Sequence, residues 1–153
     1  MPQRLDFQQV LAAGSRVLGS VYVHVQRSGL PQPLIDLVFL RASQINGCAY
    51  CIDMHSHDLI KAGTPLEKVL LLPAWHEVDG VFDTRERAAL QWTEAVTRVA
   101  DSHVPDAAFE QIKSEFDEKE IAELTLAIGL INVYNRLAIS FRRPPESTLA
   151  AKA

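Results

Sequence analysis

The stretch of sequence on which both the fold and the chemistry depend is Ser43-Gln44-Ile45-Asn46-Gly47-Cys48-Ala49-Tyr50-Cys51-Ile52-Asp53-Met54-His55. Asn46 and Gly47 tolerate left-handed backbone angles, so we expect a tight turn between two helices here. Cys48 and Cys51 then lie at the start of the second helix, three residues apart and on one face. A disulfide between them requires only a slight relaxation of the first helical turn. The stretch therefore predicts a helix hairpin that carries a Cys-x-x-Cys pair.

Acid–base groups are predicted on both helices of this hairpin. The free amides and the dipole at a helix start favour a thiolate over a thiol. His55 is one turn beyond Cys51, where it can accept the thiol proton or stabilise the thiolate. Asp36 precedes the turn by about ten residues and His55 follows it by about eight, so at ~1.5 Å per residue the two are level. We expect Asp36 to orient His55, with Asp58 as the competing carboxylate.

Other interpretations of these residues remain open at the level of sequence. Buried cysteines often do no more than pack in a core. A structural zinc ion would need Cys48, Cys51, His55 and a fourth ligand such as His57, which points elsewhere on a helix. Haem attachment would need a histidine directly after Cys51, where Ile52 stands. We therefore favour cysteine redox chemistry without a metal or cofactor.

The rest of the chain has helical periodicity. Apolar residues repeat at three-to-four spacing from Val10 to Val25, and helices are expected from Pro33, over 49–62, from Pro105-Asp106 and over about 118–140. Capping boxes are predicted at Thr64 with Glu67, Asp83 with Glu86 and Asp117 with Glu120. No alternating strand pattern occurs. The fold class is all-α, a helical bundle over 1–143, and the tail 144–153 is expected to be disordered.

The segment 118–140 is apolar on nearly every side, which requires burial on most faces. In a chain of 153 residues we expect part of this burial to come from another subunit, so a homo-oligomer is predicted. Asn132, Asn135 and Arg136 interrupt the segment. Buried polar groups need partners, and a structural role is favoured for these three over a catalytic one.

Composition excludes several classes of protein. A net charge of −4 argues against nucleic acid as a partner, because phosphate binding needs a basic surface. The apolar stretch near residue 130 is broken by polar residues, so no membrane span is expected. The N-terminal residues lack the apolar core of a signal peptide. The expected location is the cytoplasm, where a cysteine pair is more often catalytic or metal-binding than structural.

These residues resemble a known family. The core from Asp36 to His55, Asp83-Thr84-Arg85-Glu86-Arg87-Ala88-Ala89-Leu90 and Asn132-Val133-Tyr134-Asn135-Arg136-Leu137 are similar to the alkylhydroperoxidase D-like proteins of the carboxymuconolactone decarboxylase superfamily. The resemblance implies an all-helical, cofactor-free protein that forms trimers or hexamers. It also implies that Cys51 attacks peroxide, Cys48 resolves the sulfenate and His55 assists. Asp36 stands where the family has a glutamate, and Tyr50 where some peroxidases have a histidine.

The predicted function is a thiol-dependent peroxidase with Cys51, Cys48, His55 and Asp36 as its site. A hydroperoxide would be the substrate, and a lipoyl or thioredoxin-like protein would supply the reducing dithiol. One alternative is a disulfide reductase that serves a peroxiredoxin partner. Another is a redox-sensing oligomer without catalysis.

Overall fold

The computed structural model describes residues 2–150, which are helical without any β-strand. The all-α bundle predicted from the sequence is therefore confirmed. In chain order the elements are α1 (Phe7–Val10), α2 (Ala12–Gln26), α3 (Gln32–Asn46), α4 (Ala49–Lys61), α5 (Leu66–Leu71), the 3-10 helix η1 (Leu72–Glu77), α6 (Thr84–Thr97), α7 (Val99–Ser102), α8 (Asp106–Lys113), α9 (Glu118–Phe141) and α10 (Glu146–Ala150).

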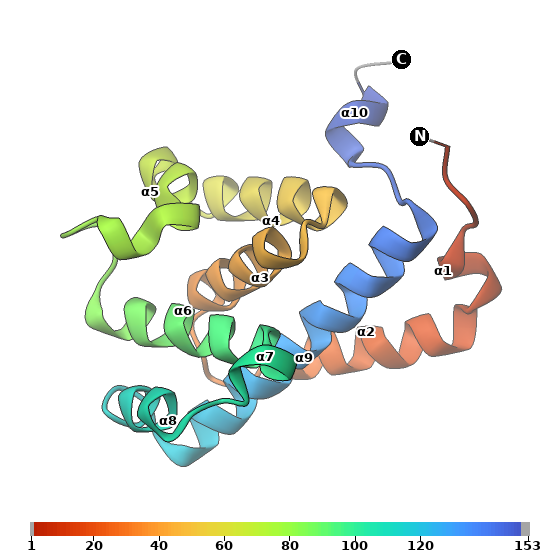
Figure 1. The fold of residues 1–153 in the computed structure, drawn as a ribbon. Helices are drawn as coiled ribbons and strands as arrows, with labels where there is room; N and C mark the ends of the chain where they lie inside the picture. Colours follow the sequence, from red (N-terminus) through yellow and green to blue (C-terminus); the bar gives the residue numbers. More distant parts are fainter. Residues whose placement is uncertain (1, 151–153) are drawn as a thin grey trace.

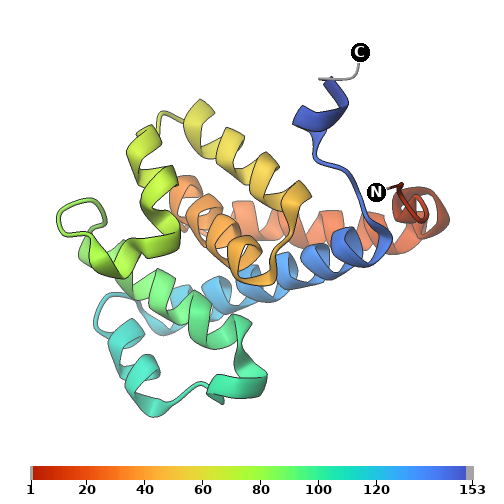
Figure 2. The ribbon, with the colours of Figure 1, turned by 45° about the horizontal axis from the view of Figure 1, so that its top comes forward.

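Helix α3 is the centre of the bundle (Figure 1). It packs against α4, α6 and α9, and α2 packs along α9 (Figure 2). Every residue from Leu34 to Ser43 is buried, because apolar side chains occur on all faces of this helix. Asp36 and Arg41 are buried with them. Each therefore needs a polar partner inside the protein.

The long helix α9 is less enclosed than its sequence suggests. Its residues Leu124, Ile128 and Ile131 are buried, but Leu126 and Val133 remain 42% and 41% exposed. By length and composition α9 could cross a membrane. Its contacts with α2, α3, α4, α6 and α8 are those of a core helix in a bundle. These exposed apolar residues are accessible to a partner subunit, and the subunit interface expected on α9 stays a prediction.

Two of the three predicted capping boxes are present. Asp83 accepts from the amide of Glu86 at the start of α6, and Asp117 accepts from that of Glu120 at the start of α9, each with the reciprocal bond. The predicted box at Thr64 is wrong, since α5 has no side-chain cap. Pro65 takes an extended ψ of 137° and becomes the cap residue itself, so the helix begins one residue later.

The C-terminal segment also differs from the sequence expectation. Disorder was expected from residue 144, yet α10 forms and docks on α4. The amide of Ser147 donates to Asp53 Oδ2 at 3.1 Å, and the Tyr50 hydroxyl donates to Glu146 at 3.3 Å. These polar contacts hold the segment at the start of α4. Residues 151–153 of the predicted tail lie outside the described residues.

Candidate functional site

The turn between α3 and α4 places the two cysteines. Gly47 ends α3 with φ 70° and ψ 33°, the left-handed conformation that its lack of a Cβ permits. The amide of Cys48 then donates to the carbonyl of Ser43 at 3.0 Å, which closes the helix end. Cys48 is the cap residue of α4, and its sulfur accepts from the amide of Cys51 at 3.4 Å. The predicted hairpin and its glycine turn are confirmed.

The two sulfurs lie 2.6 Å apart and share a hydrogen bond. Both cysteines are free thiols and only 1% exposed. The hydrogen bond with Cys51, followed by the Cys51 amide, lowers the pKa of Cys48 to about 7, against the opposing effect of burial. The same hydrogen bond and burial raise the pKa of Cys51. The pair therefore loses one proton near neutral pH and retains the other between its sulfurs.

The location of this charge differs from the sequence expectation. The helix start is expected to favour a thiolate in the cysteine pair, with His55 and Asp36 deprotonating Cys51, but the cap position belongs to Cys48. The backbone amide of Cys51, in the first turn of α4, donates to the sulfur of Cys48, so the resting charge is on Cys48. A proton that moves along the hydrogen bond from Cys51 to Cys48 transfers the charge to Cys51.

A polar network from α9 supports the turn. Asn135 is fully buried, donates to Ser43 Oγ at 3.0 Å and accepts from Asn46 at 2.8 Å. Asn132 also accepts from Asn46, at 3.0 Å. Hydrogen bonding from Asn135 contributes to the lowered pKa of Cys48, and at Cys51 it offsets part of the larger increase. The structural role expected for these asparagines is thus observed, and Asn135 in addition contacts the redox pair.

His55 lies between two carboxylates. Its Nδ1 is 4.0 Å from Asp36 Oδ1 and 3.7 Å from Asp58 Oδ2. Asp36 was expected to be level with His55 across the hairpin, and it is; Asp58 is slightly closer, so the two acids share the position. Neither ring nitrogen has a hydrogen-bond partner within the described part of the chain. Both gaps are longer than a hydrogen bond, so the two carboxylates act on the His55 ring through charge rather than through a direct hydrogen bond.

Burial determines the charges of this group. His55 is 2% exposed, and burial lowers its pKa to about 4 despite the nearby carboxylates. Burial also raises the pKa of Asp36 to about 6, although Gln32 donates to its Oδ1 at 3.1 Å. At neutral pH the imidazole is therefore uncharged beside an ionised Asp36. A neutral imidazole whose Nδ1–H faces the acids leaves Nε2 free to accept a proton.

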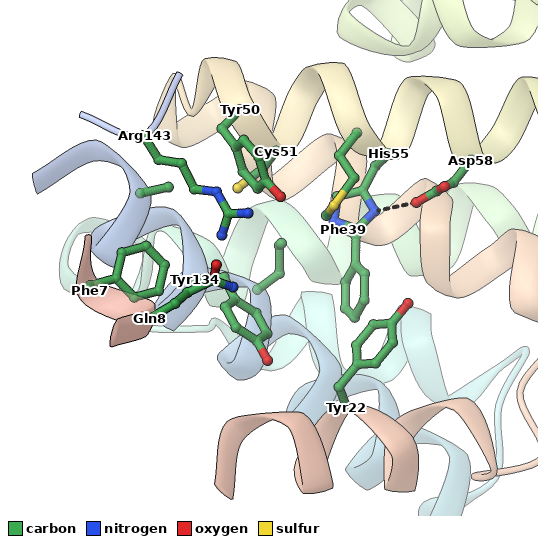
Figure 3. A pocket seen from close by; sticks show the side chains of 13 residues that line it. Phe7, Gln8, Tyr22, Phe39, Tyr50, Cys51, His55, Asp58, Tyr134 and Arg143 are labelled. Atoms are coloured by element: carbon green, nitrogen blue, oxygen red, sulfur yellow. Dashed lines mark ion pairs between the residues drawn. The ribbon is translucent and has the colours of Figure 1, made fainter. Parts of the chain in front are cut away.

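A cavity of about 270 Å³ is lined by Cys51, His55 and Asp58 (Figure 3). Its wall is mainly apolar and aromatic and includes Tyr22, Phe39 and Tyr134. Cys51 and His55 open into it from successive turns of α4, and Asp58 follows them (Figure 3). Cys48 lines a separate cleft. Of the two sulfurs, that of Cys51 is therefore the one that a molecule in this cavity would meet.

The possible metal ligands are a different set from the predicted zinc alternative. Ligand atoms of Asp36, His55 and Asp58 lie within 4.8 Å of one another and could hold a metal ion. His57 Nδ1 instead bonds the carbonyl of Asp53 at 2.8 Å, so it does not join the cysteines.

The sequence analysis missed Arg143, which reaches the cavity from beyond the end of α9. Asn135 was identified as unusual, but its contact with the thiols was not foreseen. A buried amide in an apolar helix is the sequence signal that could have located it.

Comparison with known proteins places this geometry in a family. Residues 10–95 match the carboxymuconolactone decarboxylase family. The uncharacterized protein YdfG of Bacillus subtilis is 32% identical over 140 residues, 92% of this chain and 95% of that one. YnjA of Escherichia coli, also uncharacterized, is 32% identical over 121 residues, 79% of this chain and 65% of that one.

Two solved structures are similar to this chain over most of its length. A protein of unknown function from Agrobacterium tumefaciens, suggested to be the antioxidant defence protein AhpD, has a TM-score of 0.91 and 38% identity over 94% of this chain and 98% of that one. The debrominase Bmp8, at 20% identity and a TM-score of 0.78 over 88% and 72% of the two chains, shares the fold. The chain belongs to the carboxymuconolactone decarboxylase family and is AhpD-like.

Proposed function

We propose that this protein is a thiol-dependent peroxidase that reduces hydroperoxides at Cys51 and forms a Cys48–Cys51 disulfide. The observation that carries the proposal is the pair of buried thiols 2.6 Å apart, of which Cys51 opens into a cavity shared with His55. A thiolate and a resolving thiol in contact are what two-step peroxide reduction needs.

The reaction balances without any further group. Transfer of the Cys51 proton to Cys48 or to His55 Nε2 gives a Cys51 thiolate facing the cavity. The thiolate attacks the terminal peroxide oxygen, the O–O bond breaks, and the alkoxide takes a proton to leave as an alcohol. The resulting Cys51 sulfenic acid condenses with Cys48, which forms the S–S bond and releases water. One hydroperoxide thus takes two electrons from two thiols.

An external dithiol must then return the two electrons by thiol–disulfide exchange. We propose a lipoyl or thioredoxin-like protein of the reducing cytoplasm as its source. A peroxiredoxin as electron acceptor, with this chain as its disulfide reductase, is the alternative, and a non-catalytic redox-sensing oligomer is another. The reductase would have little direct peroxide turnover of its own, and the redox sensor would have none.

Steady-state peroxide consumption in the presence of a dithiol tests the proposal. The native chain should consume an organic hydroperoxide with dithiol as the limiting reagent. The double variant Cys48→Ser/Cys51→Ser should consume it no faster than buffer. A native rate equal to that of the double variant would refute peroxidase function and favour the redox sensor. Slow direct turnover that a peroxiredoxin accelerates would favour the reductase.

Assembly is a second expected outcome. Leu126, Val133 and Ile139 leave apolar surface on α9, and exposed apolar patches mark association surfaces. We propose a homo-oligomer of three or six chains, and light scattering should report the corresponding mass. A monomer at micromolar concentration would show that these side chains face solvent in the functional protein.

We propose that Asp36 and His55 form a proton relay to Cys51, and substitution of Asp36 should change stability and reactivity in opposite directions. Asp36 has its pKa raised from 3.8 to about 6, so the folded state binds more protons between these values. Native stability therefore falls as pH rises through this window, by on the order of 3 kcal/mol. Asp36→Asn removes that cost and should raise the melting temperature at pH 7, yet slow alkylation of Cys51.

The measurement is iodoacetamide labelling of Cys51 against pH in proteins that also carry Cys48→Ser. Asp36→Glu, which restores the acid with a longer reach, should keep or improve reactivity, and Asp58→Asn tests the second carboxylate at His55. Labelling curves that coincide for native, Asn and Glu variants would mean that Asp36 is not part of the relay.

A further inference from the structure

The cavity beside Cys51 has a size and a polarity that select among hydroperoxides. Its 270 Å³ correspond to the space of about nine water molecules at about 30 Å³ each, far more than hydrogen peroxide needs. Aromatic side chains form much of the wall: Phe39 packs 5.1 Å from the His55 ring and 6.2 Å from Tyr22. Such a wall favours an apolar or aromatic substrate body.

Arg143 supplies a cation at one end of this apolar space. Its guanidinium lies 4.0 Å from the centre of the Tyr50 ring and 5.9 Å from that of Phe7. Within residues 2–150 no carboxylate oxygen pairs with it, whereas the half-buried Arg85 and Arg87 are paired with Glu120 and Asp79. A half-buried guanidinium over aromatic rings has donors left for an anion.

The opposite end of the cavity carries the opposite charge. Asp58 lines it there, with Asp36 just behind His55. In Figure 3, Cys51 and His55 lie between Arg143 on one side and Asp58 on the other. An anionic ligand would be attracted to the first end and repelled by the second, so it would enter in one orientation only.

We propose that the substrate is an apolar or aromatic hydroperoxide that bears a carboxylate, bound by Arg143 while the peroxide group meets Cys51. The inference rests on the proposed peroxidase function and adds the substrate class. Guanidinium and carboxylate match in a bidentate, charge-assisted hydrogen bond. The carboxylate fixes one end of the molecule, and the reaction at the other end is the two-electron reduction described above.

Two matched hydroperoxides test the substrate class. Cumene hydroperoxide is neutral, and its para-carboxylate differs only by the anionic group. The native protein should prefer the carboxylate by about tenfold or more in kcat/KM, the effect of one charge-assisted hydrogen bond. Arg143→Gln should bring the ratio of the two kcat/KM values near unity, and Arg143→Lys should retain part of the preference. Arg142→Gln is the matched control, because Arg143 lines the Cys51 cavity and Arg142 does not.

Binding of the unreactive analogue 4-isopropylbenzoate separates this inference from the proposed function. Calorimetry should show that the native protein and Arg142→Gln bind it at least about tenfold more tightly than Arg143→Gln does. Equal affinity in all three proteins would overturn the carboxylate site, whatever the rates of turnover. Absence of turnover with both hydroperoxides, together with Arg143-dependent binding, would instead overturn the peroxidase function and leave the anion site in place.

Discussion

We expect Cys51→Ser to abolish hydroperoxide reduction, because Cys51 is the sulfur that opens into the cavity. A serine hydroxyl is not ionised near neutral pH and does not reduce peroxide, so the rate should fall to that of buffer. Cys48→Ser should differ. The Cys51 sulfenic acid would still form but would lack its resolving partner at 2.6 Å, so it should accumulate.

Dimedone trapping followed by peptide mapping distinguishes the two variants. Cys48→Ser treated with one equivalent of hydroperoxide should carry the adduct on Cys51, and Cys51→Ser should carry none. The resting charge on Cys48 makes this a sharp test, since a thiolate there could attack directly. An adduct on Cys48 in the Cys51→Ser variant would reverse the two roles.

The second large effect is expected for folding, at Glu94 on α6. Arg41 on α3 is 9% exposed, and its Nε and Nη2 lie 2.9 and 2.7 Å from Glu94 Oε1. Trp75 of η1 donates to the same oxygen at 2.8 Å. Glu94→Gln removes the charge that compensates a buried guanidinium. The expected loss is about 3 kcal/mol of unfolding free energy, or roughly 6–12 °C in melting temperature.

An exposed ion pair provides the control. Glu110 lies 3.2 Å from Lys113, with side chains 68% and 47% exposed. Glu110→Gln should change stability by no more than about 0.5 kcal/mol, because exposed pairs are screened by solvent. Thermal unfolding of both variants measures the difference. A similar, small effect at the two positions would mean that the Arg41–Glu94 pair is not needed to hold α3 against α6.

The parts of the site that are close in sequence could be predicted from it. Gly47 fixes the turn, and helix geometry then dictates that Cys48, Cys51 and His55 share a face and that Asp36 lies level with His55. Each of these steps uses local rules, a left-handed glycine and a rise of about 1.5 Å per residue.

The parts that depend on distant residues could not be predicted. Arg143 reaches the cavity because α9 ends at Phe141 and the chain turns back at Arg142 with φ 56°. The docking of α10 depends on Tyr50 and Asp53, nearly a hundred residues away in sequence.

The most direct measurement of the central claim is a single turnover without added reductant. Reduced native protein should react with one equivalent of cumene hydroperoxide under anaerobic conditions, releasing one equivalent of the alcohol. Two thiols should be lost per chain, and peptide mapping should find a Cys48–Cys51 disulfide within one chain. Unconsumed peroxide with both thiols still titratable would contradict the account, since thiols this close in a reactive site could not remain reduced.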